Sequence, residues 1–143
     1  MQIKKISYED FDGNQRVEEH RFHLSKHELA LMEMTTEGGL EHRMRKMIQE
    51  KNPKELAKIF VGIIEQSYGI KSDDGKRFEK SPEAYKEFMS TGAYDALFME
   101  MATDEDALIT FINGILPKDM QDEIKKNGGI NKDAIQKYLD ENM

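Results

Sequence analysis

Helix-start signals recur along most of this 143-residue chain and divide it into short segments. Ser25 and Glu28 have the spacing of a capping box, in which two side chains satisfy free amides of the first helical turn. At Asn52–Pro53 and at Ser81–Pro82, an N-cap residue precedes a proline, which fits the first turn of a helix. This pattern is more compatible with a bundle of short helices than with one long helix or a large sheet.

Apolar residues recur at helical spacing after these signals. We expect helices over about residues 25–35, 40–51, 52–68, 81–90, 94–101 and 103–117, and two shorter ones around Met120 and Tyr138. The acidic run Asp104–Asp106 fits a first helical turn, because a helix N-terminus favours negative charge. The widest apolar stripe follows Pro53 and marks the principal core helix. It consists of Leu56, Ile59, Phe60, Ile63 and Ile64.

The first 24 residues alternate like two strands joined by a turn. Asp12–Asn14 supplies residues that a tight hairpin turn favours. The side chains on the expected apolar face are Ile3, Ile6 and Tyr8 before the turn, and His20, Phe22 and Leu24 after it. The step from Ile3 to Ile6 breaks the alternation and predicts a bulge or a late strand start. Because an isolated hairpin is only marginally stable in water, we expect it to lie on the helices or to pair with another copy.

A second, smaller hairpin is expected in the charged segment between residues 70 and 80. Its turn centres on Asp74–Gly75, and Ile70 and Phe78 are available as apolar anchors. The expected fold class is mainly α (α+β), an N-terminal β-hairpin packed on a bundle of about five to seven short helices. We expect one domain in three parts: a hairpin over 1–24, a helical core over 25–117 and a C-terminal helical tail over 118–143.

The composition argues against several classes of protein. A formal net charge of −7 disfavours a nucleic-acid-binding surface, which requires clustered lysine and arginine. The absence of cysteine excludes disulfides and thiolate zinc sites, and it fits a reducing compartment. No apolar run is long enough for a signal peptide or a membrane span. We therefore expect a cytoplasmic protein with no nucleic-acid or membrane partner.

No group of residues indicates catalysis, a metal or a cofactor. His20, His23 and His27 do not share a helical face, because the strand-to-helix break at Ser25 separates them, and we expect exposed hairpin and cap residues. Asp73–Gly75 resembles the start of a calcium loop, but the alternating ligands and the final glutamate are missing. No nucleophile is placed beside a base. We therefore expect a protein that is not an enzyme.

Methionine is unusually frequent, with ten residues in the chain. Unbranched methionine side chains adapt to irregular partners and are common on promiscuous binding surfaces. The expected helix over 40–51 lies between Gly38–Gly39 and Asn52–Pro53, flanks that would let it move as the wall of a groove. We predict a surface for partner binding or self-association formed by Met32, Met34, Leu40, Met44, Met47 and Ile48. The alternative is that these residues pack permanently against Phe60 and Ile64.

Three segments, taken in order, resemble one protein family. They read FDGNQRVEEHRFHLSKHEL over residues 11–29, TEGGL over 36–40 and, within 68–117, YGIKSDDGKRF followed by YDALFMEMATDEDALITFINGILP. The pattern spans residues 5–117 and resembles the tail assembly chaperones of long-tailed bacteriophages and prophages.

The resemblance implies a non-enzymatic protein of the host cytoplasm that acts during tail assembly. Such a chaperone would bind the tape measure protein, help recruit tail tube subunits, form homo-oligomers and be absent from the mature tail. Many such phages also make a longer form by ribosomal frameshift, which adds a second domain and is one possible route to the contact with the tail tube protein. The alternative left open by the composition is an acidic inhibitor or immunity-type protein that binds a single enzyme through its charged surface.

Overall fold

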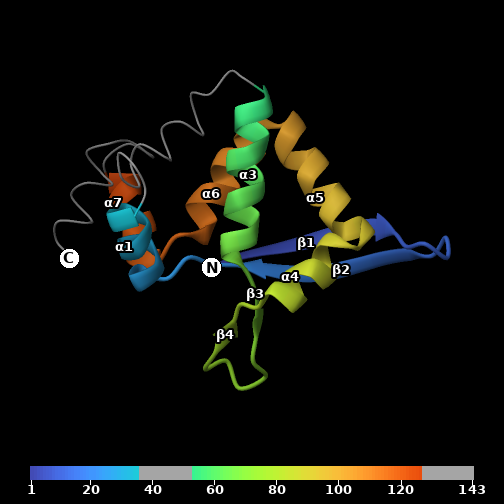
Figure 1. The fold of residues 1–143 in the computed structure, drawn as a ribbon, viewed down its shortest axis with the longest axis horizontal. Coiled ribbons are helices and arrows are strands. Elements are labelled where there is room, and N and C mark those ends of the chain that lie inside the picture. Colours follow the sequence, from blue (N-terminus) through green and yellow to red (C-terminus); the bar gives the residue numbers. More distant parts are fainter. Residues whose placement is uncertain (36–52, 127–143) are drawn as a thin grey trace.

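The structure is a computed structural model that describes residues 1–35 and 53–126. Within these ranges it contains one four-stranded sheet and six helices (Figure 1). The strands are β1 (Gln2–Glu9), β2 (Gln15–Phe22), β3 (Tyr68–Lys71) and β4 (Phe78–Glu79). The helices are α1 (Lys26–Thr35), α3 (Pro53–Ser67), α4 (Pro82–Met89), α5 (Gly92–Thr103), α6 (Glu105–Ile115) and α7 (Lys118–Lys126). The helices expected over 40–51 and around Tyr138 lie outside the described residues.

The expected fold class is confirmed, because the N-terminal hairpin belongs to a mixed α+β fold in which helices predominate. Helix α4 begins after the predicted Ser81 cap, whereas the expected start of the next-but-one helix at residue 103 is wrong, because Thr103 ends α5 and Asp104 caps α6. Ser81 Oγ accepts a hydrogen bond of 3.1 Å from Ala84 N at the start of α4. Asp104 Oδ1 accepts one of 3.1 Å from Ala107 N at the start of α6. Each cap satisfies an amide that has no partner within its own helix.

Strand β1 is regular, and the expected bulge or late start is wrong. Its register with β2 runs without interruption from the Gln2–Phe22 pair to the Glu9–Gln15 pair. The alternation breaks because Ile3 lies on the outer face of the sheet, with 46% of its surface exposed, whereas Ile6 faces the helices and is 4% exposed. Both isoleucines fit one straight strand because successive side chains point to opposite faces.

The second hairpin is present, and it extends the first into a single sheet of order β1-β2-β3-β4. Strand β3 begins directly after α3, so the helix ends at Ser67 and not at Tyr68–Gly69 as its apolar stripe predicted. Ile70 is 51% exposed, so its expected role as an anchor is wrong. Phe78 covers Gly69 closely enough that a Cβ at that glycine would lie 2.6 Å from the phenylalanine ring.

An aromatic cluster between the sheet and the helices forms the centre of the core. Phe22 of β2 is fully buried and lies 5.1 Å from the ring of Phe111 on α6. Tyr68 of β3 stacks on Phe88 of α4 with 4.5 Å between ring centroids. Helices α5 and α6 pack on β1, and α4 packs on β3, so one face of the sheet is covered (Figure 1). The turn end of the first hairpin extends beyond these helices.

The expectation that all three N-terminal histidines are exposed is wrong for two of them. The His20 ring is half-buried and lies 4.6 Å from the ring of Phe88, as its position on the same face as Phe22 requires. His23 is half-buried against Phe78 at 6.2 Å. His27 is exposed at the start of α1.

A candidate partner-binding cleft between α1, α3 and α4

The connector His23–Ser25 places α1 relative to the core. Its first amide, His23 N, donates a hydrogen bond of 2.8 Å to Ser67 O at the end of α3. The next amide, Leu24 N, donates one of 2.7 Å to Ile115 O at the end of α6. The side chain of Leu24 is buried. The C-terminal ends of two core helices therefore hold the segment from which α1 begins.

The predicted capping box is formed, and it also receives a distant lysine. Ser25 N donates to Glu28 Oε1 at 3.0 Å, and Ser25 Oγ donates to the same oxygen at 2.8 Å. Lys80 Nζ, just before α4, donates to Glu28 Oε2 at 2.6 Å and to His23 O at 2.6 Å. One ammonium group thus ties the first turn of α1 and the connector to the start of α4. A second ion pair, between Lys26 and Asp119 at 2.8 Å, joins the first turns of α1 and α7.

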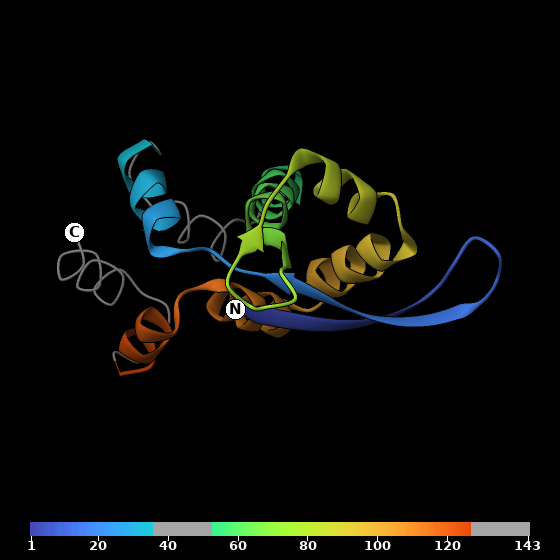
Figure 2. The ribbon, with the colours of Figure 1, turned by 90° about the horizontal axis from the view of Figure 1, so that it is seen from below.

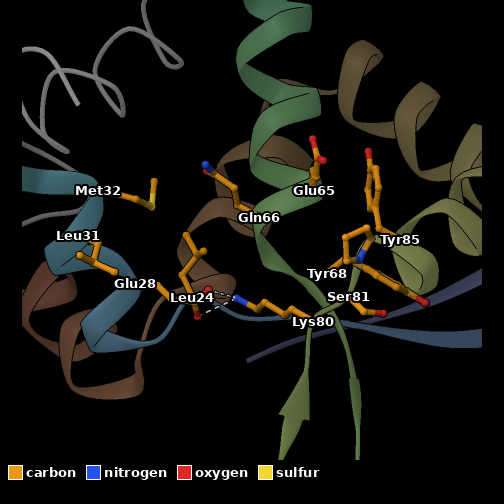
Figure 3. A pocket seen from close by; sticks show the side chains of 11 residues that line it. Leu24, Glu28, Leu31, Met32, Glu65, Gln66, Tyr68, Lys80, Ser81 and Tyr85 are labelled. Atoms are coloured by element: carbon orange, nitrogen blue, oxygen red, sulfur yellow. Dashed lines mark hydrogen bonds and ion pairs between the residues drawn. The ribbon is translucent and has the colours of Figure 1, made fainter. Parts of the chain in front are cut away.

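A cleft of about 370 Å³ opens beside the Lys80–Glu28 ion pair (Figure 3). Helix α1 forms one wall, and α3 with the start of α4 forms the other. The lining residues are Glu28, Leu31 and Met32 of α1; Glu65 and Gln66 of α3; Lys80, Ser81, Pro82 and Tyr85 at α4; and Leu24 and Tyr68. Apolar side chains predominate, with the charged groups at a few positions, as in sites that bind apolar ligands or side chains.

The pKa values of Glu28 and of the nearby His23 are both shifted from their ordinary values. Burial opposes ionisation of Glu28, but hydrogen bonds from Lys80 and Ser25 outweigh it and hold the pKa of this carboxyl below its ordinary value. Burial also lowers the pKa of His23, and the positive charges of the N-terminus and Lys80 add to this effect. His23 Nδ1 is buried without a hydrogen-bond partner among the described residues. At neutral pH, Glu28 is therefore charged and His23 neutral.

The two described residues of the predicted methionine surface lie at different depths. Met32 is 8% exposed and lines the cleft, whereas Met34 is 73% exposed on the outer side of α1. Leu31, which the sequence interpretation omitted, is 55% exposed and also lines the cleft. The other four predicted residues, Leu40, Met44, Met47 and Ile48, lie outside the described residues. The structure thus brings together one predicted methionine and one unpredicted leucine.

Tyr68, Pro82 and Tyr85 were also missed as cleft residues. Their sequence signals are those of a strand start and of a capped helix, which give no indication of a partner surface. Leu31 carried a usable signal, because it follows Glu28 by one helical turn and so lies above the capping box on the same side of α1.

Neither a metal cluster nor a membrane-spanning helix is present in the described part of the chain. No cluster of three or more histidine, cysteine or carboxylate side chains there could hold a metal ion. Within the same ranges, no helix is both long enough and apolar enough to cross a membrane. What this cleft offers is a surface for binding, with apolar walls and one internal ion pair.

A comparison with known families supports a binding role. The family model described as phage tail assembly chaperone matches residues 1–143. The chain belongs to the phage tail assembly chaperone family. The match includes residues 118–143, which lie beyond the segments whose resemblance was recognised in the sequence. No curated protein and no solved structure matches the chain.

The family assignment decides between the two functions that the composition left open. Tail assembly chaperones are a non-enzymatic family, so the expected absence of catalytic activity is confirmed. A role in bacteriophage tail assembly, with tail proteins as partners, follows from membership. The full-length match favours this role over that of an acidic inhibitor of a single enzyme.

Proposed function

We propose that this tail assembly chaperone binds the tape measure protein in the host cytoplasm and helps recruit tail tube subunits around it. In this proposal several copies act together, and none remains in the mature tail. A tape measure protein is a long helical chain whose apolar surface is unprotected until the tube encloses it. A carrier that covers this surface prevents aggregation in the meantime.

The proposal rests on the cleft beside α1, together with the membership of the chain in this family. Leu31 is 55% exposed at the cleft, and Met34 is 73% exposed on the outer side of the same helix. An amphipathic helix binds to such a surface by inserting apolar side chains spaced three or four residues apart. The flexible side chains of Met32 and Met34 allow different client segments to fit.

The negative charge of this protein restricts which client segments match the cleft. Glu65 is exposed at the cleft, and the whole chain carries a net charge of −7. Lys80 lies beside Glu28 and is already neutralised by it. A client segment with basic residues flanking its apolar side chains therefore matches the cleft better than an acidic one does. We include Leu40, Met44, Met47 and Ile48 in the proposed contact set, for the client or for a second copy.

Leu31→Asp tests the proposal, with Met99→Asp as its matched control. Both side chains are exposed to nearly the same extent on helices, at 55% and 57%, but Met99 lies on α5, away from the cleft. The probe is a set of labelled helical peptides that cover the tape measure protein of the same phage, measured by fluorescence anisotropy. We expect Leu31→Asp to weaken binding of the tightest peptide by at least about thirtyfold and Met99→Asp to leave it unchanged.

Two results would contradict the proposal. Equal losses in both variants would show that the cleft is not the binding surface. Failure of every tape measure peptide to bind the unaltered chain would reject the client itself. Thermal melts of both variants establish that each is folded before binding is compared.

A further inference from the structure

The sequence of β1 and the start of its turn has a charge pattern with a centre. Residues 3–11 read Ile-Lys-Lys-Ile-Ser-Tyr-Glu-Asp-Phe. Positions at equal distances before and after Ser7 match in character. The apolar matches are Ile6 with Tyr8 and Ile3 with Phe11, and the basic residues Lys5 and Lys4 match the acidic Glu9 and Asp10. The segment is therefore complementary to a second copy of itself that runs in the opposite direction.

Strand β1 is at the border of the sheet, and its pairing with β2 shows which of its backbone groups face the free edge. The strand order places β2 on one side of β1, and no described strand pairs with its other side (Figure 2). Asp10 N donates to Asn14 O at 2.8 Å, so even-numbered residues of β1 direct their amides and carbonyls toward β2. The odd-numbered residues direct theirs toward the free edge. These are Ile3, Lys5, Ser7 and Glu9.

We propose that β1 pairs antiparallel with β1 of a second copy, around a two-fold axis at Ser7. In this register Lys5 of each copy lies opposite Glu9 of the other, and Ile6 lies opposite Tyr8. Ile3 lies opposite the position of Phe11. All backbone hydrogen bonds of the contact come from odd-numbered residues, which are the ones that face the free edge.

Other two-fold registers are less favourable. An axis at Ile6 places Lys5 opposite Ser7 and Ile3 opposite Glu9, so neither charge has a partner. An axis at Lys5 places the two Lys5 side chains opposite each other, which is repulsive. Lysines on an edge strand usually discourage pairing. Here they exclude the wrong registers and favour the one centred on Ser7.

Exposure and unused interactions support the same contact. Ile3 is 46% exposed and Phe11 is 91% exposed, so the pairing would cover two of the larger apolar side chains on the surface. Lys5 and Glu9 are exposed, and no hydrogen bond or ion pair joins either side chain to another described residue, although Glu19 of β2 lies opposite Lys5 in the register. The pair of Lys4 with Asp10 contributes less, because Lys4 already contacts Glu100 and Asp10 already contacts Arg16.

The turn that carries Phe11 is ordered before any contact is made. Asp10 Oδ1 accepts hydrogen bonds from Asp12 N and Asn14 N, both at 2.9 Å. Asp10 Oδ2 accepts one of 2.6 Å from Arg16 Nε, and Gly13 adopts the positive φ of 83° that the turn requires. Little conformational freedom is lost when such a turn meets a partner, which favours association.

This contact rests on the self-association included in the proposed function and defines its geometry. It joins two four-stranded sheets into one, and the two-fold symmetry closes it, so it yields discrete dimers. Each dimer then carries two clefts. A long client with repeated apolar segments would engage both, and the second engagement is favoured because it is intramolecular.

Charge reversal tests the register directly. Lys5→Glu and Glu9→Lys each replace two attractive pairs with two repulsive ones, and we expect each variant alone to dimerise at least about tenfold more weakly. In a mixture, one copy is acidic at both positions and the other is basic at both, so all pairs are attractive again. We expect dimers to reappear in the mixture and in the double variant Lys5→Glu/Glu9→Lys. Sedimentation velocity measures all four samples, and melting temperatures establish that each is folded.

Hydrogen exchange supplies a second readout on the unaltered chain. Raising the protein concentration should slow exchange of the amides of Lys5, Ser7 and Glu9. The amides of Lys4, Ile6 and Tyr8 already bond to β2 and should not change. The proposal is overturned if the unaltered chain stays monomeric, if the single variants dimerise as well as it does, if the mixture fails to recover, or if the two sets of amides respond alike.

The cleft is tested separately with the monomeric Lys5→Glu variant. Binding of a single tape measure peptide to this variant should be unchanged, because the cleft lies away from β1. Dimers without peptide binding would reject the proposed client but not the β1 contact. Peptide binding by an unaltered chain that never dimerises would reject the β1 contact but not the client.

Discussion

The start of helix α1 and the aromatic core are held in place by different kinds of interaction. In the core, Phe22, Phe88 and Phe111 meet face to edge and are almost completely excluded from water. Helix α1 also buries Leu29 and Met32 in the core, but its start is held by polar contacts: two backbone hydrogen bonds of the connector and the Lys80–Glu28 ion pair. Apolar burial is favourable in proportion to area, whereas an ion pair near the surface gives a small net gain.

The difference indicates which part of the molecule can adapt. The core fixes the sheet and α3 to α6, and the apolar side chains that stay exposed in that region, such as Ile3, Phe11 and Met99, do not line the cleft. Leu31 remains exposed at the cleft and Met34 on the outer side of the same helix, whose start is held by polar contacts. Under the proposed function, small shifts of α1 would let the cleft fit different segments of the client.

The largest expected effect is in the core. Phe111→Ala removes a ring that is 1% exposed and contacts Phe22, so the free energy of unfolding should fall by about 3–5 kcal/mol. Chemical denaturation measures the loss. Met99→Ala is the control, because its side chain is 57% exposed and should change stability little. Comparable losses in both variants would contradict the assignment of the core.

An intermediate effect is expected where α1 is attached. Lys80→Ala leaves the partly buried Glu28 carboxylate without its ammonium partner, which should cost about 1–3 kcal/mol. Hydrogen exchange should accelerate mainly within Lys26–Thr35, while amides of β1 and β2 keep their protection. Equal acceleration in the sheet would show that α1 and the core unfold as one unit, and the contrast between them would be lost.

Mild acid should weaken the α1 side before the core, with the smallest effect of the three. The pKa of His23 is lowered from 6.5 in the folded chain, so its stabilising contribution is complete above that value and is lost as pH falls through the folded pKa. The pKa of Glu28 is lowered from 4.5, so its contribution is lost in the same direction but only below that value. Stability should therefore decline in two steps.

Glu28→Gln separates the two steps. In this variant the loss of stability below pH 4.5 should disappear, and the loss that begins at pH 6.5 should remain. Thermal melts between neutral and acidic pH measure both losses. Burial raises the pKa of Tyr68 and of Tyr85, so the phenols at the edge of the core stay protonated throughout. A single acid transition that is identical in both proteins would contradict these assignments.

Much of the fold could be predicted because its signals are local. The capping box at Ser25 and the caps at Ser81 and Asp104 each lie within three residues of the amide that they satisfy. Strand β4 has only two residues, and its pairing with β3 extends a sheet whose first two strands lie about 50 positions earlier in the chain. No local pattern specifies such a pairing, so the second hairpin could be predicted but its place in the sheet could not.

The cleft was harder to predict than the fold. Lys80 and Glu28 are 52 positions apart, and nothing near either residue indicates the other. Met32 and Leu31 are adjacent in sequence, yet a rotation of one residue around the helix makes one buried and the other exposed. Methionine content led to the prediction of a surface that includes α1, but only packing determines which side chains of the helix are exposed.

The central claim is that the tape measure protein binds at the α1 cleft. It is tested most directly by hydrogen exchange of the unaltered chain with and without the tightest tape measure peptide. We expect slower exchange in Lys26–Thr35 and in the segment that follows α3 into α4, with amides of α5 unchanged. Slower exchange confined to α5 or to other faces, with α1 unchanged, would contradict it.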